Sequence, residues 1–219
     1  MKRQSKNLSS VLEHHLSMYT LAASAAGVGM LALAQSAEAK IIYTKTHEVI
    51  APAQQYDLDL SHDKTTDFTL VNFWTTQCPD SCAQWLYLKP AAGNSEIGSV
   101  TRGWHFARAL SKGSAIGPEG HFLAGNASMV AAFSTQPSVG PWRNVTNRYL
   151  GLKFQIKGKT HYGWARLSVT GGFGSIVATL TGYAYETVPN KRIIAGTTKG
   201  PDVITVEPAT LGRLALGRR

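Results

Sequence analysis

The chain has 219 residues and carries 22 Lys and Arg against 13 Asp and Glu, a formal net charge of +9 at pH 7. The excess lies late in the chain, because twelve basic residues face three acidic ones from Arg143 onward. A basic half of this kind suggests a nucleic acid as a binding partner. No RNA- or DNA-binding motif is present, so we exclude that class and expect an anionic polysaccharide or simple solvation instead.

The first 39 residues have the three-part order of a bacterial secretory signal. Three basic residues precede an apolar run from about Leu16 to Ala34, and Ala37-Glu38-Ala39 supplies the small residues of a cleavage site. We expect a helical signal peptide over residues 1–39, cut after Ala39 by signal peptidase. The protein is then secreted, or held at the cell surface or in the periplasm, and only this peptide contacts a membrane. The alternative is an uncleaved anchor, but a run of about 19 residues rich in Ala, Gly and Ser is weakly hydrophobic for a bilayer span.

Beyond residue 40 the pattern favours strands, because short β-branched or aromatic runs are separated by turn residues. We expect residues 40–200 to form one all-β domain, a two-sheet antiparallel sandwich of the jelly-roll type. The segment from Pro90 to Gly125 is expected to be rich in loops. The predicted strands are 41–50, 66–75, 84–88, 129–133, 149–157, 161–169 and 175–187, with 193–195 and 203–206 closing the domain.

Alternation within the late strands predicts which side chains face the core. Leu150, Leu152 and Phe154 share one face of their strand, so we expect them to be buried. In the predicted strand 175–187 the same reasoning places Tyr183 and Tyr185 on the face opposite that of Ala178 and Leu180.

The two cysteines of the chain are Cys78 and Cys82, which in an exported protein predict a disulfide. The alternative is a redox pair, because Leu70-Val71-Asn72-Phe73-Trp74 resembles the strand before a thioredoxin active site. Three residues separate the cysteines, however, and no helix follows to lower the pKa of a thiol. A structural disulfide is the favoured interpretation.

An acidic segment offers oxygen ligands at the spacing of a calcium loop. Asp59, Ser61, Asp63 and Asp67 occupy positions 1, 3, 5 and 9 of such a loop, so calcium is a candidate cofactor. Lys64 stands where the loop normally has a glycine. The alternative is an acidic, solvated connection between two strands, which needs no cofactor.

Aromatic and basic residues of the second half are candidate contacts for carbohydrate. Aromatic rings on a sheet face stack on sugars, and neighbouring guanidinium groups hold acidic sugars. The alternative is that the rings pack in the core, as aromatic residues in strands commonly do. The candidate contacts are Trp142, Arg143, Tyr162, Trp164 and Arg166.

No catalytic constellation is legible in the sequence. The histidines lack metal-ligand spacing, and nothing nominates two acidic residues as a glycosidase pair.

The end of the chain contains Glu207-Pro208, an Ala-Thr-Leu-Gly run and a terminal Arg218-Arg219 pair. It resembles the PEP-CTERM sorting signal of exported bacterial proteins. The segment Gly163-Trp164-Ala165-Arg166-Leu167, followed by Ala184-Tyr185-Glu186, also resembles a stretch common in such proteins. The resemblance implies handling by an exosortase and association with the cell surface or exopolysaccharide. Residues 201–219 would be a shortened form of the signal, and the alternative is an ordinary basic tail.

The sequence therefore predicts an exported surface or matrix-associated protein without catalytic activity. A carbohydrate-binding module for anionic polysaccharide is the first alternative. A secreted glycosidase or thiol oxidoreductase is the second.

Overall fold

The structure is a computed structural model that describes residues 40–75 and 82–200 of the chain. All elements of regular secondary structure in these residues are β-strands, which confirms the predicted all-β class. None of these residues forms a helix of the length and apolar character that a membrane crossing needs. The predicted signal peptide (1–39), the strand expected at 203–206 and the tail at 201–219 lie outside the described residues.

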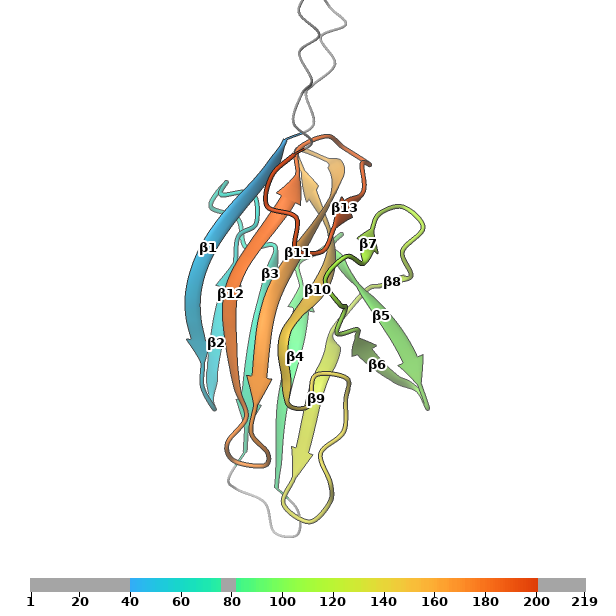
Figure 1. Ribbon diagram of the computed structural model, residues 1–219. Coiled ribbons are helices and arrows are strands. Elements are labelled where there is room, and N and C mark those ends of the chain that lie inside the picture. Colours follow the sequence, from blue (N-terminus) through green and yellow to red (C-terminus); the bar gives the residue numbers. More distant parts are fainter. Residues whose placement is uncertain (1–39, 76–81, 201–219) are drawn as a thin grey trace, which may run out of the picture. The chain divides into compact units, whose positions relative to one another are not determined.

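Two facing layers of antiparallel strands make up most of the domain (Figure 1). The first layer has the strand order β1-β12-β11-β10, and the second has the order β2-β3-β4-β9. The first layer consists of β1 (Ile41–Ile50), β12 (Val177–Glu186), β11 (Lys159–Thr170) and β10 (Val145–Ile156). The second consists of β2 (Gln54–Leu58), β3 (Phe68–Trp74), β4 (Ala83–Pro90) and β9 (Ala127–Phe133).

The two layers are joined along one side. β5 (Ser95–Thr101) pairs with β10, β6 (Trp104–Ala107) pairs with β5, and β6 runs parallel to β9. With β8 (Phe122–Leu123), which pairs with β5, all these strands form one eleven-stranded mixed sheet that folds back on itself. β7 (Ala115–Ile116) and β13 (Ile193–Ile194) form a separate two-stranded sheet.

Apolar side chains of both layers fill the space between them. The side chains of Leu150, Leu152 and Phe154 are fully buried there, as their alternation predicts. They meet residues of the second layer, namely Leu70, Leu86, Leu88 and Met129. Burial of each such side chain contributes about 1.5–3 kcal/mol to folding, so this core is the main source of stability.

A buried polar network ties the two layers together. The Asn72 amide on β3 donates to the carbonyl oxygens of Ile50 and Ile176, at 3.1 Å and 2.8 Å. Gln84 on β4 donates to the Asn72 side-chain oxygen at 2.8 Å and accepts from the Ile176 backbone N–H at 3.2 Å. Each amide is fully buried, and these bonds fix how the layers are aligned.

A β-bulge in β12 corrects the predicted orientation of two tyrosines. The pairing of β12 with β11 and with β1 passes over Thr181. Because side chains alternate along a strand, one inserted residue reverses the faces beyond it. Tyr183 and Tyr185 therefore lie with Leu180 in the core between the layers, and the prediction that placed them on the opposite face is wrong.

The segment expected to be rich in loops contains four strands. β5, β6, β7 and β8 all lie between Pro90 and Gly125, so this prediction is wrong in part. These strands have two to seven residues and are separated by turns. At that length the apolar alternation is too short to stand out against the turn signals.

Candidate functional site

The aromatic residues predicted to contact carbohydrate are buried, which corrects that prediction. The side chains of Trp142 and Trp164 are fully buried, and Tyr162 keeps 4% of its surface exposed. Trp142 Nε1 donates to the Ala107 carbonyl oxygen at 2.9 Å, and Trp164 Nε1 donates to that of Thr197 at 3.2 Å. Core packing, the alternative interpretation, therefore describes all three rings.

Trp164 and Tyr162 belong to a second apolar core on the outer face of the first layer. The Trp164 ring packs tilted against Tyr43 and edge-on against Tyr149, with centroids 5.8 Å and 5.3 Å apart. β7 and β13 cover this core through Ile116 and Ile193. The outer face of the first layer is thus partly a second interior.

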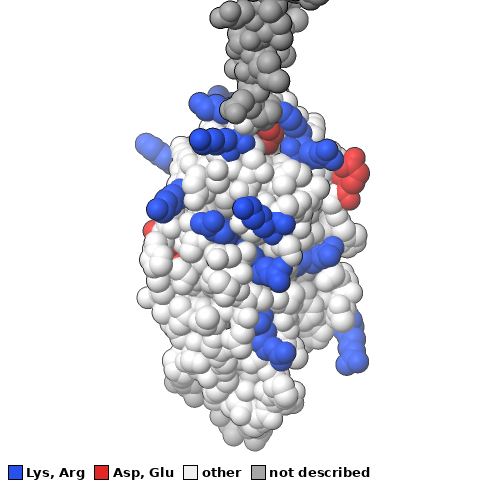
Figure 2. Space-filling view, in the orientation of Figure 1, with Lys and Arg blue, Asp and Glu red and all other residues white. Residues whose placement is uncertain are grey.

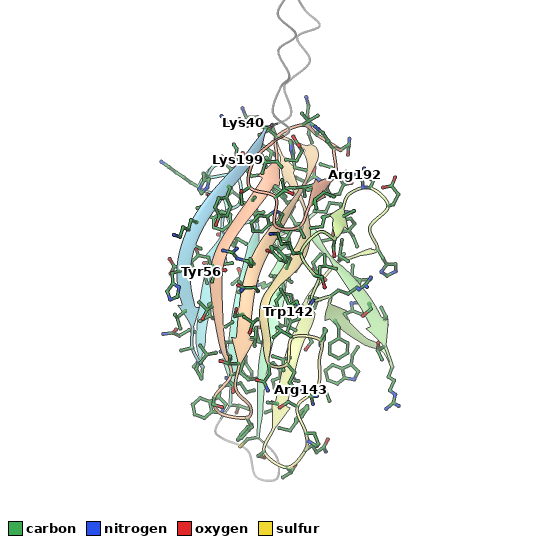
Figure 3. The ribbon with its side chains drawn as sticks, viewed as in Figure 1. Lys40, Tyr56, Trp142, Arg143, Arg192 and Lys199 are labelled. Atoms are coloured by element: carbon green, nitrogen blue, oxygen red, sulfur yellow. The ribbon has the colours of Figure 1, made fainter. Side chains whose placement is uncertain are left out.

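The two predicted arginines lie apart from one another. Arg143 is exposed in the loop before β10, and its Nη1 donates to the Ser138 carbonyl oxygen at 3.1 Å (Figure 3). Arg166 lies on β11 and donates from Nε to the Thr181 hydroxyl at 2.7 Å and from Nη2 to the Thr181 carbonyl at 3.2 Å. They do not form one site with the buried rings.

The acidic segment folds into a loop that is closed by its own carboxylates. Asp59 accepts hydrogen bonds from the backbone N–H groups of His62 and Lys64, at 2.7 Å and 2.8 Å. Asp63 accepts from Thr65 at 2.9 Å, and the buried Asp67 accepts from Leu60 at 2.9 Å. These bonds satisfy donors that a loop of this shape would otherwise expose.

The same loop does not assemble the predicted calcium ligands. Among the residues that the structure describes, no three His, Cys, Asp or Glu side chains are grouped so that they could hold a metal ion. Burial raises the pKa of Asp67 to about 6, the Leu60 N–H opposes this rise, and the charges of Asp59 and Asp63 add to it. In the described chain the carboxylates of Asp59, Asp63 and Asp67 close a turn, and the calcium site stays a prediction.

An aromatic surface does exist, but on the outer face of the second layer. Two neighbouring hollows of about 450 and 390 Å³ share Trp104 and Ser128 in their walls. We call these two hollows the aromatic cleft. Its aromatic lining residues are Trp85, Tyr87, Trp104, Phe106 and Phe133, and its polar ones include Arg102, His105, Asn126 and Ser128.

Trp104 occupies the most accessible position in the cleft. Its side chain keeps 54% of its surface exposed, the largest fraction among the exposed large apolar residues of the described chain. It follows a two-residue turn in which Arg102 and Gly103 both have positive φ, 50° and 81°. Such a turn matches the twist of the hairpin that β5 and β6 form, so it fixes where Trp104 begins β6.

Two rings of the cleft wall, Trp85 and Phe133, and the neighbouring Phe73 contact one another across three strands. Phe73 on β3 stacks on Trp85 on β4, with centroids 5.9 Å apart. Trp85 meets Phe133 on β9 edge-on, at 6.3 Å between centroids. These rings hold each other in place, so the cleft presents aromatic faces on rigid strands.

Polar groups are set among these rings. Arg102 and His105 are exposed and are the basic residues of the lining. Ser128 lies between the two hollows, and its buried hydroxyl has no hydrogen-bond partner among the described residues. A pocket with apolar walls and a few polar groups is the usual form of a binding site for a small ligand or a sugar.

A buried acidic residue lies on β5, before the part of this strand that pairs with β6 in the hairpin. Glu96 on β5 is fully buried, and neither of its carboxylate oxygens has a partner from another residue in the described part of the chain. Burial raises its pKa to about 8, partly offset by its own backbone N–H. Glu96 therefore stays protonated at neutral pH.

The sequence reasoning missed the aromatic cleft, although one signal for it was present. In β4 the residues Trp85 and Tyr87 alternate with the buried Leu86 and Leu88, which predicts an aromatic outer face. Trp104 could not be placed because it lies in the segment interpreted as loops.

The remaining predicted site residues lie wholly or partly outside the described chain. Cys78, Ala39, Glu207-Pro208 and Arg218-Arg219 are among the residues that the structure does not describe. Cys82 is described, and its backbone N–H donates to the Ser134 hydroxyl at 3.1 Å. The disulfide, the cleavage site and the sorting signal stay predictions.

Comparison with protein-family models, curated proteins and solved structures finds no match for this chain.

Proposed function

We propose that this chain is an exported, non-catalytic protein that binds a polysaccharide in the aromatic cleft and so associates with the cell surface or extracellular matrix. The observation that carries the proposal is the position of Trp104. Its ring is more than half exposed and stands between two hollows that are lined by further rings.

The chemistry of the cleft suits a sugar polymer. The C–H-rich face of a pyranose stacks on an aromatic ring, while its hydroxyl groups need hydrogen-bond partners close by. Asn126 and His105 supply such partners beside Trp104. Arg102 supplies a cation at the edge of the second hollow, which suits a polymer that contains acidic sugars.

The wider setting rests on the sequence. The signal peptide at 1–39 and the tail at 201–219, with its resemblance to a sorting signal, support export to a place where polysaccharide is abundant. A secreted glycosidase is the competing function at the same cleft. Turnover of the bound polymer would distinguish it from simple binding.

The test is affinity electrophoresis of the purified full chain through gels that contain alginate, polygalacturonate, xylan or dextran. We expect at least one of these polymers to retard the protein. Trp104→Ala should weaken the retardation by about tenfold in apparent affinity, about 1.4 kcal/mol. Trp104→Phe should keep most of it, because an aromatic face remains.

Stability measurements separate loss of binding from loss of fold. Because Trp104 is largely exposed, its replacement should change the free energy of unfolding by no more than about 0.5 kcal/mol. Val49→Ala, at a residue that is 52% exposed on β1, is the matched control and should leave binding unchanged. Equal retardation of wild type and Trp104→Ala, or no retardation by any polymer, would overturn the proposal.

A further inference from the structure

The outer face of the first layer carries many Lys and Arg side chains. Figure 2 shows Lys and Arg side chains spread over the face that β1, β12, β11 and β10 present in Figure 1, with few acidic side chains among them. We call the following six residues the basic face: Lys45, Lys112, Lys153, Arg166, Arg192 and Lys199.

The strand register brings part of this charge into one row. Lys45 on β1 lies opposite Gly182 on β12, Gly182 lies opposite Arg166 on β11, and Arg166 lies opposite Tyr149 on β10. Directly opposite residues of paired strands point to the same side of a sheet. The row therefore crosses four strands, about 14 Å at the usual strand spacing, with its cations on β1 and β11 and the buried Tyr149 on β10.

Lys112 extends the row beyond β10. A Cβ on Gly196 would lie 2.9 Å from the Tyr149 hydroxyl oxygen and 3.0 Å from Lys112 Cγ, so these three residues are close neighbours. Lys153 lies on β10 with its ammonium 5.1 Å from the centre of the Phe122 ring. Arg192 and Lys199 lie toward the end of this layer where Lys40 is found (Figure 3).

Few acids neutralise this face. Within the described residues one ion pair is formed, between Lys191 and the buried Glu186 at 3.7 Å. The acidic loop adjoins the edge of this layer, since the Thr44 hydroxyl on β1 lies 2.7 Å from His62 Nε2 of that loop, but the Asp59 and Asp63 carboxylates accept hydrogen bonds from the loop's own backbone. Glu119 also lies near the face, since burial raises the pKa of Tyr162 and the charge of Glu119 adds to that rise.

Arg166 is the best-oriented cation of the row. Two hydrogen bonds to Thr181 hold its guanidinium group, through Nε and Nη2, and Nη1 is left without a partner in the described part of the chain. A planar guanidinium fixed in this way is suited to a carboxylate or sulfate group, because little side-chain freedom is lost on binding.

We propose that the basic face is a second binding site, separate from the aromatic cleft, and that it holds a linear anionic polysaccharide across β1, β12, β11 and β10. A linear polymer fits this arrangement because the cations lie in a row across the strands. The two sites lie on the two outer surfaces of the folded sheet, so one molecule can bind an anionic strand on one side and a sugar chain on the other.

The test uses the full chain and dextran sulfate as the polyanion. We expect wild type to bind dextran sulfate with an affinity that falls steeply as NaCl is raised from 50 to 300 mM, since exposed charges are screened at high salt. The double variant Lys45→Gln/Lys112→Gln should bind at least tenfold more weakly at low salt. It should keep its affinity for any neutral polymer that the cleft binds.

A matched control separates this site from the effect of net charge. Lys64→Gln/Lys89→Gln removes the same two charges from exposed positions outside the basic face. Equal weakening by the two double variants would show attraction by net charge alone and would overturn the proposal. So would binding of anionic lipid vesicles, sensitive to Lys45 and Lys112, in the absence of dextran sulfate binding.

Trp104→Ala completes the design. It should leave dextran sulfate binding intact, because Trp104 lies on β6 in the aromatic cleft and not on the basic face. If Trp104→Ala abolishes dextran sulfate binding and the lysine variants do not, the polymer binds in the cleft and the second site does not exist.

Discussion

The rings of Phe73 and Trp85 stack on the outer surface of the second layer, with their centroids 5.9 Å apart and their planes inclined by 26°. Phe73 keeps 45% of its surface exposed, so the pair is formed at the surface and not in the core. Because Trp85 also lines the aromatic cleft, this pair links the edge of the layer to the proposed binding site.

We predict that Phe73 and Trp85 are energetically coupled. A double-mutant cycle with Phe73→Ala and Trp85→Ala should give a coupling free energy of about 0.5–1.5 kcal/mol, the range of aromatic pairs beyond simple burial. Urea unfolding of the four proteins measures it. Strictly additive effects would mean that the stacking does not position Trp85.

Trp164 should prove to be a core residue and not a ligand contact. Trp164→Ala should lower the free energy of unfolding by about 3–5 kcal/mol, because a fully buried ring and its contacts with Tyr43 and Tyr149 are removed. Trp164→Phe should cost less, mainly the hydrogen bond to Thr197. Thermal unfolding is the measurement, with the exposed Arg143→Ala as the near-neutral control. An unchanged midpoint for Trp164→Ala would contradict the burial.

Glu96 should make stability fall as the pH rises through the neutral range. Its folded pKa is about 8 and its ordinary value is 4.5, so between these pH values the folded state binds more protons than the unfolded state. The free energy of unfolding therefore decreases with rising pH and levels off above about pH 8. Asp67, with a folded pKa of about 6, adds the same trend only at lower pH.

Glu96→Gln isolates this effect. Urea unfolding from pH 6.5 to 8.5 should show that wild type loses roughly 1–2 kcal/mol relative to the Gln variant, given about 1.4 kcal/mol for each pH unit over which one proton is released. Glu119→Gln, at an exposed position, should run parallel to wild type. Parallel curves for wild type and Glu96→Gln would refute the assignment of the slope to Glu96.

Cleavage after Ala39 should leave the domain intact. β1 begins at Ile41, and the backbone nitrogen of Lys40 donates to the Thr187 hydroxyl at 3.1 Å. We expect the protein secreted by a bacterial host to begin at Lys40 when its N-terminus is sequenced. A product that still begins at Met1 would favour the uncleaved anchor.

The predicted Cys78–Cys82 disulfide should be present in the exported protein. Alkylation without reductant should leave its mass unchanged, and reduction before alkylation should add two groups. Because the loop is short, reduction should lower the free energy of unfolding only at the low end of the range of about 0–5 kcal/mol. Rapid alkylation of the unreduced protein would argue against the disulfide.

Much of the fold could be predicted from alternation in the long strands. Leu150, Leu152 and Phe154 repeat every second residue over a strand of twelve residues, which is enough to assign both the strand and its buried face. The short strand β2 escaped the same reasoning because its five residues, Gln54–Leu58, carry two glutamines and an aspartate.

The orientation of Tyr183 and the location of the site could not be predicted in this way. Alternation assumes an unbroken ladder, and the bulge at Thr181 depends on pairing with strands distant in sequence. The aromatic cleft likewise depends on β6 pairing with β9, which brings Trp104 beside Trp85 although nineteen positions separate them. Aromatic content alone therefore could not separate the buried rings from the exposed ones.

The position of β1 at one end of the strand order has a consequence for how copies of the protein behave when crowded together. β1 ends the strand order, and its pairing with β12 shifts register between Lys45 and Glu48. An incoming strand would meet a kink there, and the exposed side chains of Lys45 and His47 would hinder its approach. Molecules gathered densely along a polymer can thus stay individually folded and resist amyloid-like stacking.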